Sequence, residues 1–338
     1  MSYHFKNLVF EGGGVKGIAY VGAMEALAQK GIVPDIKRVG GTSAGAINAI
    51  LVGLNYSNEE TKKILWDLDF NKFMDHSRFI FWDIWRLAKK FGWNKGDFFR
   101  KWIGGIIKEK TGSSEVTFAD ISAQKKEKGF KDIYIAGTNL STHFSEVFSH
   151  EKTPDMAVAD AVRISMSIPL FFTAVRSKRE DVYVDGGVLA NYPVKLFDRK
   201  KYVAENLLRP HYYEEHNAKL KDAGIQISDY VYNQETLGFR LDSRQEIGMF
   251  RDQKEPVHNV IKGFGAYARG LIMTMIDHQL NLHLHSDDWQ RTIYIDASIA
   301  ETAEFDLADE KKTALFEAGR EGVREYFDWY DNNECANK

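Results

Sequence analysis

Two apolar runs with strand character lie near the start of the chain, and each is followed by a run with the spacing of a helix. Apolar residues dominate residues 5–10, which predicts a strand, and apolar positions over 18–27 recur at helical intervals. Residues 36–40 form a second short β-capable run, and the apolar run 46–54 predicts a buried helix. Strands that alternate with helices in this way predict an α/β fold with a mainly parallel sheet.

The rest of the chain continues this pattern without an internal repeat or a low-complexity linker. We predict strands over residues 130–139, 182–185 and 291–296, an edge strand over 237–241, and helices over 156–164 and 308–329. Thr153 followed by Pro154 predicts the N-cap of the first of these helices. Residues 200–253 are polar and rich in aromatic residues, which indicates a loop-rich insertion. We therefore expect one domain over residues 1–330, a twisted, mainly parallel sheet with helices on both faces, and a polar tail at 331–338.

A serine lies between two glycines at the second strand-to-helix turn, in the order Gly41-Thr42-Ser43-Ala44-Gly45. This is the pattern of a nucleophile elbow, in which a tight turn exposes the serine hydroxyl and the following helix directs its positive end toward a developing oxyanion. At this glycine content the pattern alone occurs by chance in roughly one chain in ten. Its place between a strand and a helix makes Ser43 a candidate nucleophile.

A glycine-rich loop over residues 11–17 follows the first predicted strand and has two interpretations. Gly12, Gly14 and Gly17 match G-x-G-x-x-G, and Asp35 lies near the place of a ribose-binding acid, which is typical of a dinucleotide site. The same bare amides are also suited to form an oxyanion hole for the serine. Beside a serine elbow we favour the oxyanion hole. Lys16 is either a residue that holds a substrate phosphate or, as is commoner, a solvated lysine at the start of a helix.

The predicted strand 182–185 runs into Asp185-Gly186-Gly187. Aspartate before two glycines is usually a turn former, but a serine elbow makes Asp185 a candidate general base. A triad in the order Ser, Asp, His would need one of the histidines that follow it, none of which lies in a predicted strand-end loop: His211, His216, His258, His278, His283 and His285. The pair His283 and His285 has the spacing of a strand and lacks a supporting carboxylate, so no metal site is expected.

The three motifs stand in the order found in patatin-like phospholipases, and the chain resembles that family over residues 5 to about 200, with a weaker likeness to about 328. Residues 165–172 and 191–194 resemble the segments that flank the aspartate strand in that family. The resemblance implies a patatin-like variant of the α/β-hydrolase fold, with the site at the carboxyl ends of the strands.

The resemblance also implies a Ser–Asp dyad in which Ser43 attacks an acyl ester and Asp185 is the general base. The oxyanion hole then comes from the loop Gly12, Gly13, Gly14, Val15, Lys16 and Gly17, and the supporting glycines are Gly41, Gly45, Gly186 and Gly187. The expected substrates are phospholipids or lysophospholipids, hydrolysed through an acyl-serine without a metal or cofactor. The alternatives are a neutral-lipid or acyl-CoA esterase and a catalytically silent lipid- or nucleotide-binding regulator.

Composition limits the partners and the compartment that we expect. The 45 basic and 48 acidic residues nearly balance, which argues against a nucleic-acid polymer as partner. The single cysteine, Cys335, excludes an intrachain disulfide and favours a reducing compartment. No apolar run reaches 18 residues, and no signal-peptide core is found at the amino end. We therefore expect a cytoplasmic protein that associates peripherally with membranes when active.

Aromatic and basic residues gather over residues 78–110, with a break at 92–96, and this segment is predicted to form a cap over the site. Its residues are suited to an anionic membrane surface, but aromatic residues that merely pack the cap against the core are the commoner case. The residues that suggest docking are Phe79, Phe81, Trp82, Trp85, Phe91, Trp93, Phe98, Phe99 and Trp102, with Arg78, Arg86, Lys89, Lys90, Lys95, Arg100 and Lys101. The insertion at 200–253 is the expected place for a small-molecule or protein activator to bind.

Overall fold

The first two strand–helix units form as the sequence predicts. The computed structural model describes residues 3–73, 89–209, 213–225, 229–242, 261–263, 266–267, 270–271, 274–275, 287–302, 304–335 and 337–338. β1 (Asn7–Phe10) leads through the 3-10 turn η1 (Gly14–Ile18) into α1 (Ala19–Gln29), and β2 (Arg38–Gly41) leads into α2 (Ala44–Gly53). Both glycine motifs therefore lie in strand-to-helix connections.

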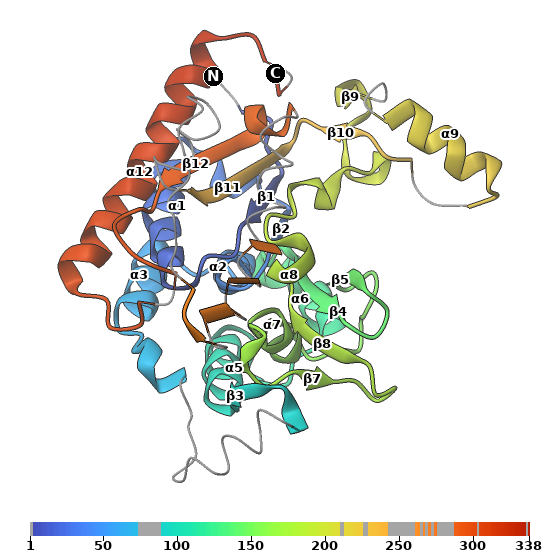
Figure 1. Ribbon diagram of the computed structural model, residues 1–338. Coiled ribbons are helices and arrows are strands. Elements are labelled where there is room, and N and C mark those ends of the chain that lie inside the picture. Colours follow the sequence, from blue (N-terminus) through green and yellow to red (C-terminus); the bar gives the residue numbers. More distant parts are fainter. Residues whose placement is uncertain are drawn as a thin grey trace.

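A mostly parallel sheet lies at the centre of the molecule and confirms the α/β prediction (Figure 1). Its strand order is β12-β11-β1-β2-β4-β8-β7, and β5 also pairs with β4. Five strands run parallel to one another, whereas β5, β7 and β8 contribute antiparallel pairs. The remaining strands of the sheet are β4 (Asp132–Asn139), β5 (Phe144–Phe148), β7 (Val175–Arg176), β8 (Val182–Asp185), β11 (Thr236–Asp242) and β12 (Thr292–Asp296).

The strands that carry the serine and aspartate motifs, β2 and β8, lie along the same edge of β4. Ile135 of β4 pairs with Gly41 of β2 and, on its other edge, with Phe148 of β5. Gly137 pairs with Asp185 of β8 and also with β5, so β8 lies on the side that β2 occupies. Since β2 runs parallel and β8 antiparallel to β4, their carboxyl ends approach each other. Asp185 therefore lies near the carboxyl end of β2, although β8 runs in the direction opposite to β2.

The prediction that residues 237–241 form an edge strand is wrong. β11 pairs with β1 on one side and with β12 on the other, and all seven of its residues are buried. Its charged residues Arg240 and Asp242 are also buried and form an ion pair at 2.6 Å. Because each charge has a partner inside the protein, their presence in the strand does not indicate an exposed edge.

Helices cover the face of the sheet that carries the main core. Phe10 of β1 stacks on Phe239 of β11 and packs edge-on against Tyr20 of α1. α12 (Asp309–Asn332) runs alongside α1 and β12 (Figure 1). Val9 and Tyr134 point to the opposite face and pack against the segment 197–202. The other helices are α3 (Asn58–Trp66), α5 (Asp97–Thr111), α6 (Phe118–Lys128), α7 (Val158–Ser165), α8 (Gly187–Ala190) and α9 (Glu214–Asp222).

The break predicted inside the cap segment is a short strand followed by a helix start. β3 (Gly92–Asn94) pairs in parallel with β6 (Leu170–Phe172), and Gly96, in a left-handed conformation, precedes α5. Phe99 of α5 is buried, as packing of the aromatic residues against the core requires. Six of the residues that suggest docking lie within 74–88, outside the described residues: Arg78, Phe79, Phe81, Trp82, Trp85 and Arg86.

The insertion and the ends of the chain complete the fold. Within 200–253, α9 projects away from the sheet, and β9 (Leu208–Arg209) pairs with β10 (Tyr232–Asn233) (Figure 1). The N-cap prediction at Thr153 is wrong, because α7 starts at Val158 after Ala157 and the Thr153 hydroxyl bonds to Ser149. Among the described helices, none is long and apolar enough to cross a membrane.

Candidate active site

Ser43 occupies a strained elbow between β2 and α2. Its φ of 53° and ψ of −124° fall where residues other than glycine rarely lie, which costs on the order of 1–3 kcal/mol. A side chain at Gly45 would come within 2.3 Å of the Phe10 carbonyl oxygen, so this glycine allows the start of α2 to pack against the end of β1. A side chain at Gly41 would clash with Gly45 itself. The predicted supporting roles of both glycines therefore have a steric basis.

Asp185 ends β8 and is buried with one oxygen unused. Its Oδ1 accepts the amide N–H of Gly187 at 2.7 Å, while its Oδ2 accepts no hydrogen bond from the described residues. Burial raises the pKa of the Asp185 carboxyl from 3.8 to about 7, and the Gly187 amide and the Ser43 hydroxyl oppose that rise less strongly. Gly186 fits beside β4, since a side chain there would approach the Ala136 carbonyl oxygen to 2.5 Å.

The two predicted catalytic residues lie close together, but the serine hydroxyl is directed elsewhere. Ser43 is near enough to Asp185 to lower its pKa, whereas the Ser43 hydroxyl donates to Met166 Sδ at 3.5 Å. A thioether sulfur is a weak acceptor, so rotation of the hydroxyl toward the unused oxygen of Asp185 loses little. The carboxyl ends of β2 and β8 thus bring a serine hydroxyl close to a buried carboxylate.

The glycine loop after β1 lies directly against the elbow. A side chain at Gly12 would approach Ser43 Cβ to 3.0 Å, and one at Gly17 would approach Ala44 Cβ to 3.1 Å. Some amides of this loop are already engaged: Gly12 N–H donates to Asn191 O at 3.1 Å, Val15 N–H to Thr302 O at 3.3 Å, and Lys16 N–H to Gly13 O at 3.2 Å. Of the six residues predicted to form the oxyanion hole, Gly12, Val15 and Lys16 therefore have amides that already donate a hydrogen bond within the protein.

Three amides of the glycine loop and the elbow have no acceptor among the described residues, those of Gly13, Gly14 and Ala44. Ala44 is the first residue of α2, so its amide lies at the positive end of a buried helix. Ala44 is missing from the sequence-based site, although the residue after an elbow nucleophile commonly donates to the oxyanion. The Lys16 side chain is partly exposed in η1, and its ammonium group makes no ion pair within the described part of the chain.

Asn191 is a second residue that the sequence analysis did not assign to the site. It accepts the Gly12 amide through its main-chain oxygen, and its side-chain Nδ2 donates to the Gly12 carbonyl at 3.2 Å and to Glu11 Oε1 at 3.3 Å. The other oxygen of Glu11 accepts the Leu241 amide at 2.7 Å. These bonds fix the glycine loop to the segment that follows Asp185.

The carboxyl end of α7 and the residues that follow it contact both Ser43 and Asp185. Ser165 Oγ accepts the main-chain N–H of Ser43 at 2.9 Å, and Ser167 O accepts the main-chain N–H of Asp185 at 2.9 Å. The sequence analysis identified the segment 165–172 by its resemblance to the family. Its pattern did not predict that Ser165 and Ser167 accept these two main-chain hydrogen bonds.

The dinucleotide interpretation of the glycine loop does not fit the geometry. Asp35 lies before β2, in η2 (Val33–Asp35), and pairs with Lys6 at 3.4 Å, just ahead of β1. A ribose-binding acid belongs at the carboxyl end of β2, where Gly12 and Ser43 lie. Asp35 is therefore at the opposite end of the sheet from the loop it would have to serve.

The histidines considered for a triad do not join the site where they are described. His216 lies in α9 and packs against Tyr230, with ring centroids 4.8 Å apart. The others, His211, His258, His278, His283 and His285, lie outside the described residues. Within the described part of the chain, no three His, Cys, Asp or Glu side chains are grouped so as to hold a metal ion.

Comparison with known proteins identifies relatives of this chain. The sequence model of the patatin-like phospholipase family matches residues 8–198. The uncharacterised protein YqhO of Bacillus subtilis is 31% identical over 328 residues, which cover 92% of this chain and 94% of that protein. An uncharacterised protein of Acanthamoeba polyphaga mimivirus is 36% identical over 194 residues, 57% of this chain and 61% of the relative. A probable lipid hydrolase of Invertebrate iridescent virus 6 is 25% identical over 198 residues, 57% of this chain and 63% of that protein.

A solved structure shares the fold. VipD from Legionella pneumophila superimposes with a TM-score of 0.58 at 16% identity, over 97% of this chain and 67% of that chain. The family model covers more than half of the sequence, and YqhO aligns with nearly all of it. This chain belongs to the patatin-like phospholipase family.

Proposed function

We propose that this chain hydrolyses fatty-acyl esters of phospholipids or lysophospholipids through a dyad of Ser43 and Asp185. The observation that carries the proposal is the state of Asp185. Its carboxyl group is buried beside the serine elbow, has one oxygen free of hydrogen bonds from the described residues, and has its pKa raised to about 7. A general base with such a pKa is matched to proton transfer near neutral pH.

Acylation requires the Ser43 hydroxyl to turn from Met166 toward Asp185 Oδ2. Ser43 Oγ then bonds to the ester carbonyl carbon while Asp185 takes its proton, and the carbonyl electron pair moves onto oxygen. When the tetrahedral intermediate collapses, the carbonyl re-forms and the bond to the alcohol oxygen breaks. Asp185 gives its proton to that departing oxygen, which leaves the acyl group on Ser43.

Deacylation repeats these steps with water as the nucleophile. Asp185 removes a proton from water, and the resulting oxygen bonds to the acyl carbon. Collapse of the second intermediate breaks the bond to Ser43 Oγ, which recovers its proton from Asp185. The products are a free fatty acid and the unchanged enzyme.

The oxyanion of both intermediates needs donors that are not already engaged. We assign this role to the amides of Gly13, Gly14 and Ala44, because nothing among the described residues accepts from them. Each such donor is typically worth about 3 kcal/mol in the transition state. Lys16 adds a positive charge on the same loop.

The lipid surface is proposed to meet the protein at the small sheet of β3 and β6. Three large apolar residues are exposed in or next to these elements: Leu170 of β6 at 39%, Phe91 directly before β3 at 44%, and Phe98 of α5 at 38%. Leu170 pairs with Gly92 and lies on the segment that contacts Ser43, so this patch borders the site.

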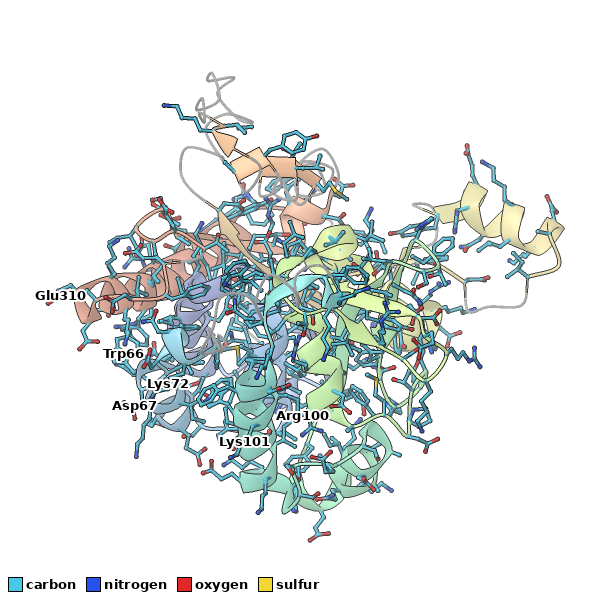
Figure 2. The ribbon with its side chains drawn as sticks, turned by 60° about the horizontal axis from the view of Figure 1, so that its bottom comes forward. Trp66, Asp67, Lys72, Arg100, Lys101 and Glu310 are labelled. Carbon is cyan, nitrogen blue, oxygen red and sulfur yellow. The ribbon has the colours of Figure 1, made fainter. Side chains whose placement is uncertain are left out.

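Exposed basic residues on the same segment as the apolar patch favour anionic phospholipid as the surface that it contacts. Lys89, Lys90, Lys95 and Lys101 are exposed on the same segment. Lys72, from η3 (Phe70–Phe73), lies on the same face of the molecule as Lys101 of α5 (Figure 2). Cations at headgroup depth bind lipid phosphates, while exposed rings enter the interface between headgroups and acyl chains.

The deciding experiment measures fatty-acid release from mixed phospholipid liposomes, without added calcium, by wild type and by Ser43→Ala. Release that disappears in the variant supports serine-dependent lipid hydrolysis, and equal release by both rules out the dyad. A panel of phospholipids, triacylglycerol and acyl-CoA then distinguishes the phospholipase from a neutral-lipid or acyl-CoA esterase.

A further inference from the structure

Arg163 lies buried between the cap segment and the two catalytic residues, although no step of the proposed reaction uses it. It belongs to the last turn of α7, and its side chain is 7% exposed. A guanidinium group in such a place needs hydrogen-bond acceptors, because burial of an ionised group without partners is costly. The identity of those acceptors shows what Arg163 holds together.

On one side Arg163 holds the segment that connects β3 to α5. Its Nη2 donates to the main-chain oxygen of Lys95 at 2.6 Å and to that of Thr173 at 3.1 Å. Thr173 Oγ1 donates to the same Lys95 oxygen at 2.8 Å. Gly96 passes so close that a side chain there would lie 2.3 Å from Nη2. The guanidinium therefore fixes the 95–96 turn against Thr173, the residue that follows β6.

On the other side Arg163 holds the residue that supports the base. Its Nη1 donates to Ser167 Oγ, and Ser167 Oγ donates back to the Arg163 main-chain oxygen at 2.8 Å. The main-chain oxygen of Ser167 accepts the Asp185 amide at 2.9 Å. Ser167 is fully buried, so it has no water to replace a lost contact with Arg163.

The same short segment reaches the nucleophile. Ser165, two residues after Arg163, accepts the Ser43 amide, and Met166 accepts the Ser43 hydroxyl. The segment 163–174 thus contacts Ser43 and Asp185 at one end. At its other end, Thr173 N–H donates to Asn94 O at 2.8 Å and Ala174 N–H donates to Lys90 O at 3.1 Å.

We infer that Arg163 is a positioning residue that sets the separation of Ser43 and Asp185 by tying the cap segment 90–96 to the turn after α7. This inference rests on the proposed dyad. Arg163 acts through geometry, because the causes of the raised pKa of Asp185 are burial, the Gly187 amide and the Ser43 hydroxyl, and Arg163 is not one of them. The reaction rate falls steeply when a nucleophile and its base are displaced from each other by about 1 Å.

The test compares Arg163→Met, Ser167→Ala and the double variant with Arg38→Met in the full chain. Arg38 is the control, since it is half-buried and, like Arg163, donates to a side chain and a main-chain oxygen, but at the amino end of β2. Hydrolysis of a short, water-soluble aryl ester is measured, so that membrane binding plays no part. We expect kcat to fall about tenfold or more in Arg163→Met with KM nearly unchanged, and to stay near wild type in Arg38→Met.

The double variant and the pH profile separate positioning from general destabilisation. If Arg163 acts through Ser167, the double variant is no slower than Arg163→Met, because both changes break the same link. The pH at half-maximal kcat should be the same in all variants. Wild-type kcat in folded Arg163→Met, or additive losses in the double variant, would overturn the inference.

Amide hydrogen exchange keeps the inference testable if no ester is hydrolysed. Arg163→Met should speed exchange in peptides that contain Ser43, Asp185 and residues 90–96, and Arg38→Met should not. Inactive wild type with this local pattern means that the dyad proposal fails while the structural link holds. Exchange that rises equally throughout both variants contradicts the positioning role.

Discussion

The main-chain N–H of Ser43 donates to the side-chain oxygen of Ser165 at 2.9 Å. In an elbow, this amide would otherwise face the developing oxyanion or remain without a partner in the core. Its use by Ser165 stabilises the strained turn and leaves oxyanion binding to neighbouring amides. Ser43 is therefore held by α7 as well as by its own strand and helix.

Replacement of Ser165 should weaken both the elbow and catalysis. In Ser165→Ala the buried Ser43 amide loses its acceptor, which costs roughly 1–3 kcal/mol. We expect a lower midpoint of thermal unfolding and a fall in kcat of about tenfold. Ser149→Ala is the control, because the Ser149 hydroxyl is buried and has no hydrogen-bond partner among the described residues. Equal effects of both substitutions on kcat would show that the Ser43 contact has no special role.

Removal of the Asp185 charge should abolish hydrolysis and stabilise the fold at alkaline pH. Asn keeps the shape and an oxygen for the Gly187 amide but cannot accept the Ser43 proton, so kcat should fall about 10³-fold or more. The folded-state pKa of about 7 lies above the unfolded value of 3.8, so ionisation opposes folding by at most about 4 kcal/mol above pH 7.

The stability effect has a defined direction with pH. Wild type should lose stability as the pH rises from about 4 through 7, and Asp185→Asn should not show this loss. Denaturant unfolding of both proteins at pH 5 and pH 8 measures the difference. A variant that is no more stable than wild type at pH 8 would argue against a buried, costly carboxylate at this position.

The pH dependence of the reaction follows from the same group. Asp185 must be ionised to act as base, so kcat/KM should fall on the acid side with an apparent pKa near 7. A soluble ester assayed from pH 5 to pH 9 gives this limb without interference from lipid packing. An acid limb near pH 4 would instead indicate a solvated carboxylate.

The order of the motifs could be predicted from the sequence, but their convergence could not. The sequence predicts the position of two motifs, because each lies between a predicted strand and a predicted helix. They are the elbow Gly41-Thr42-Ser43-Ala44-Gly45 and the glycine loop. Asp185 lies beside them because β8 and β2 share an edge of β4, and strand pairing between distant segments leaves no local trace. The edge prediction for residues 237–241 is wrong for the same reason, because the pairing of β11 with β1 and with β12 joins distant segments.

A side chain at Gly12 should disable the site although it adds a single methyl group. Cβ of Gly12→Ala would lie 2.4 Å from Asn191 Oδ1 and 3.0 Å from Ser43 Cβ, so the loop must move away from the elbow. We expect about a 10²-fold loss of kcat, the size of the loss of one oxyanion donor. Gly105→Ala is the control, since nothing lies within 4 Å of the added atom in α5 and alanine favours a helix. Similar kcat values for the two variants would contradict the assignment of the glycine loop to the oxyanion hole.

Exposed rings near the site should matter for lipid surfaces and not for soluble esters. Phe98→Ser removes a ring that is 38% exposed on α5, beside Lys101, and should weaken binding to anionic liposomes several-fold with an unchanged rate on a soluble ester. Phe144→Ser is matched to it, because Phe144 is 70% exposed but begins β5, on the edge of β4 opposite to β2 and β8. Sedimentation of both variants with liposomes of increasing anionic content measures the difference. If Phe144→Ser weakens binding as much as Phe98→Ser, exposed apolar area in general drives adsorption, and the patch at β3 and β6 is not the docking surface.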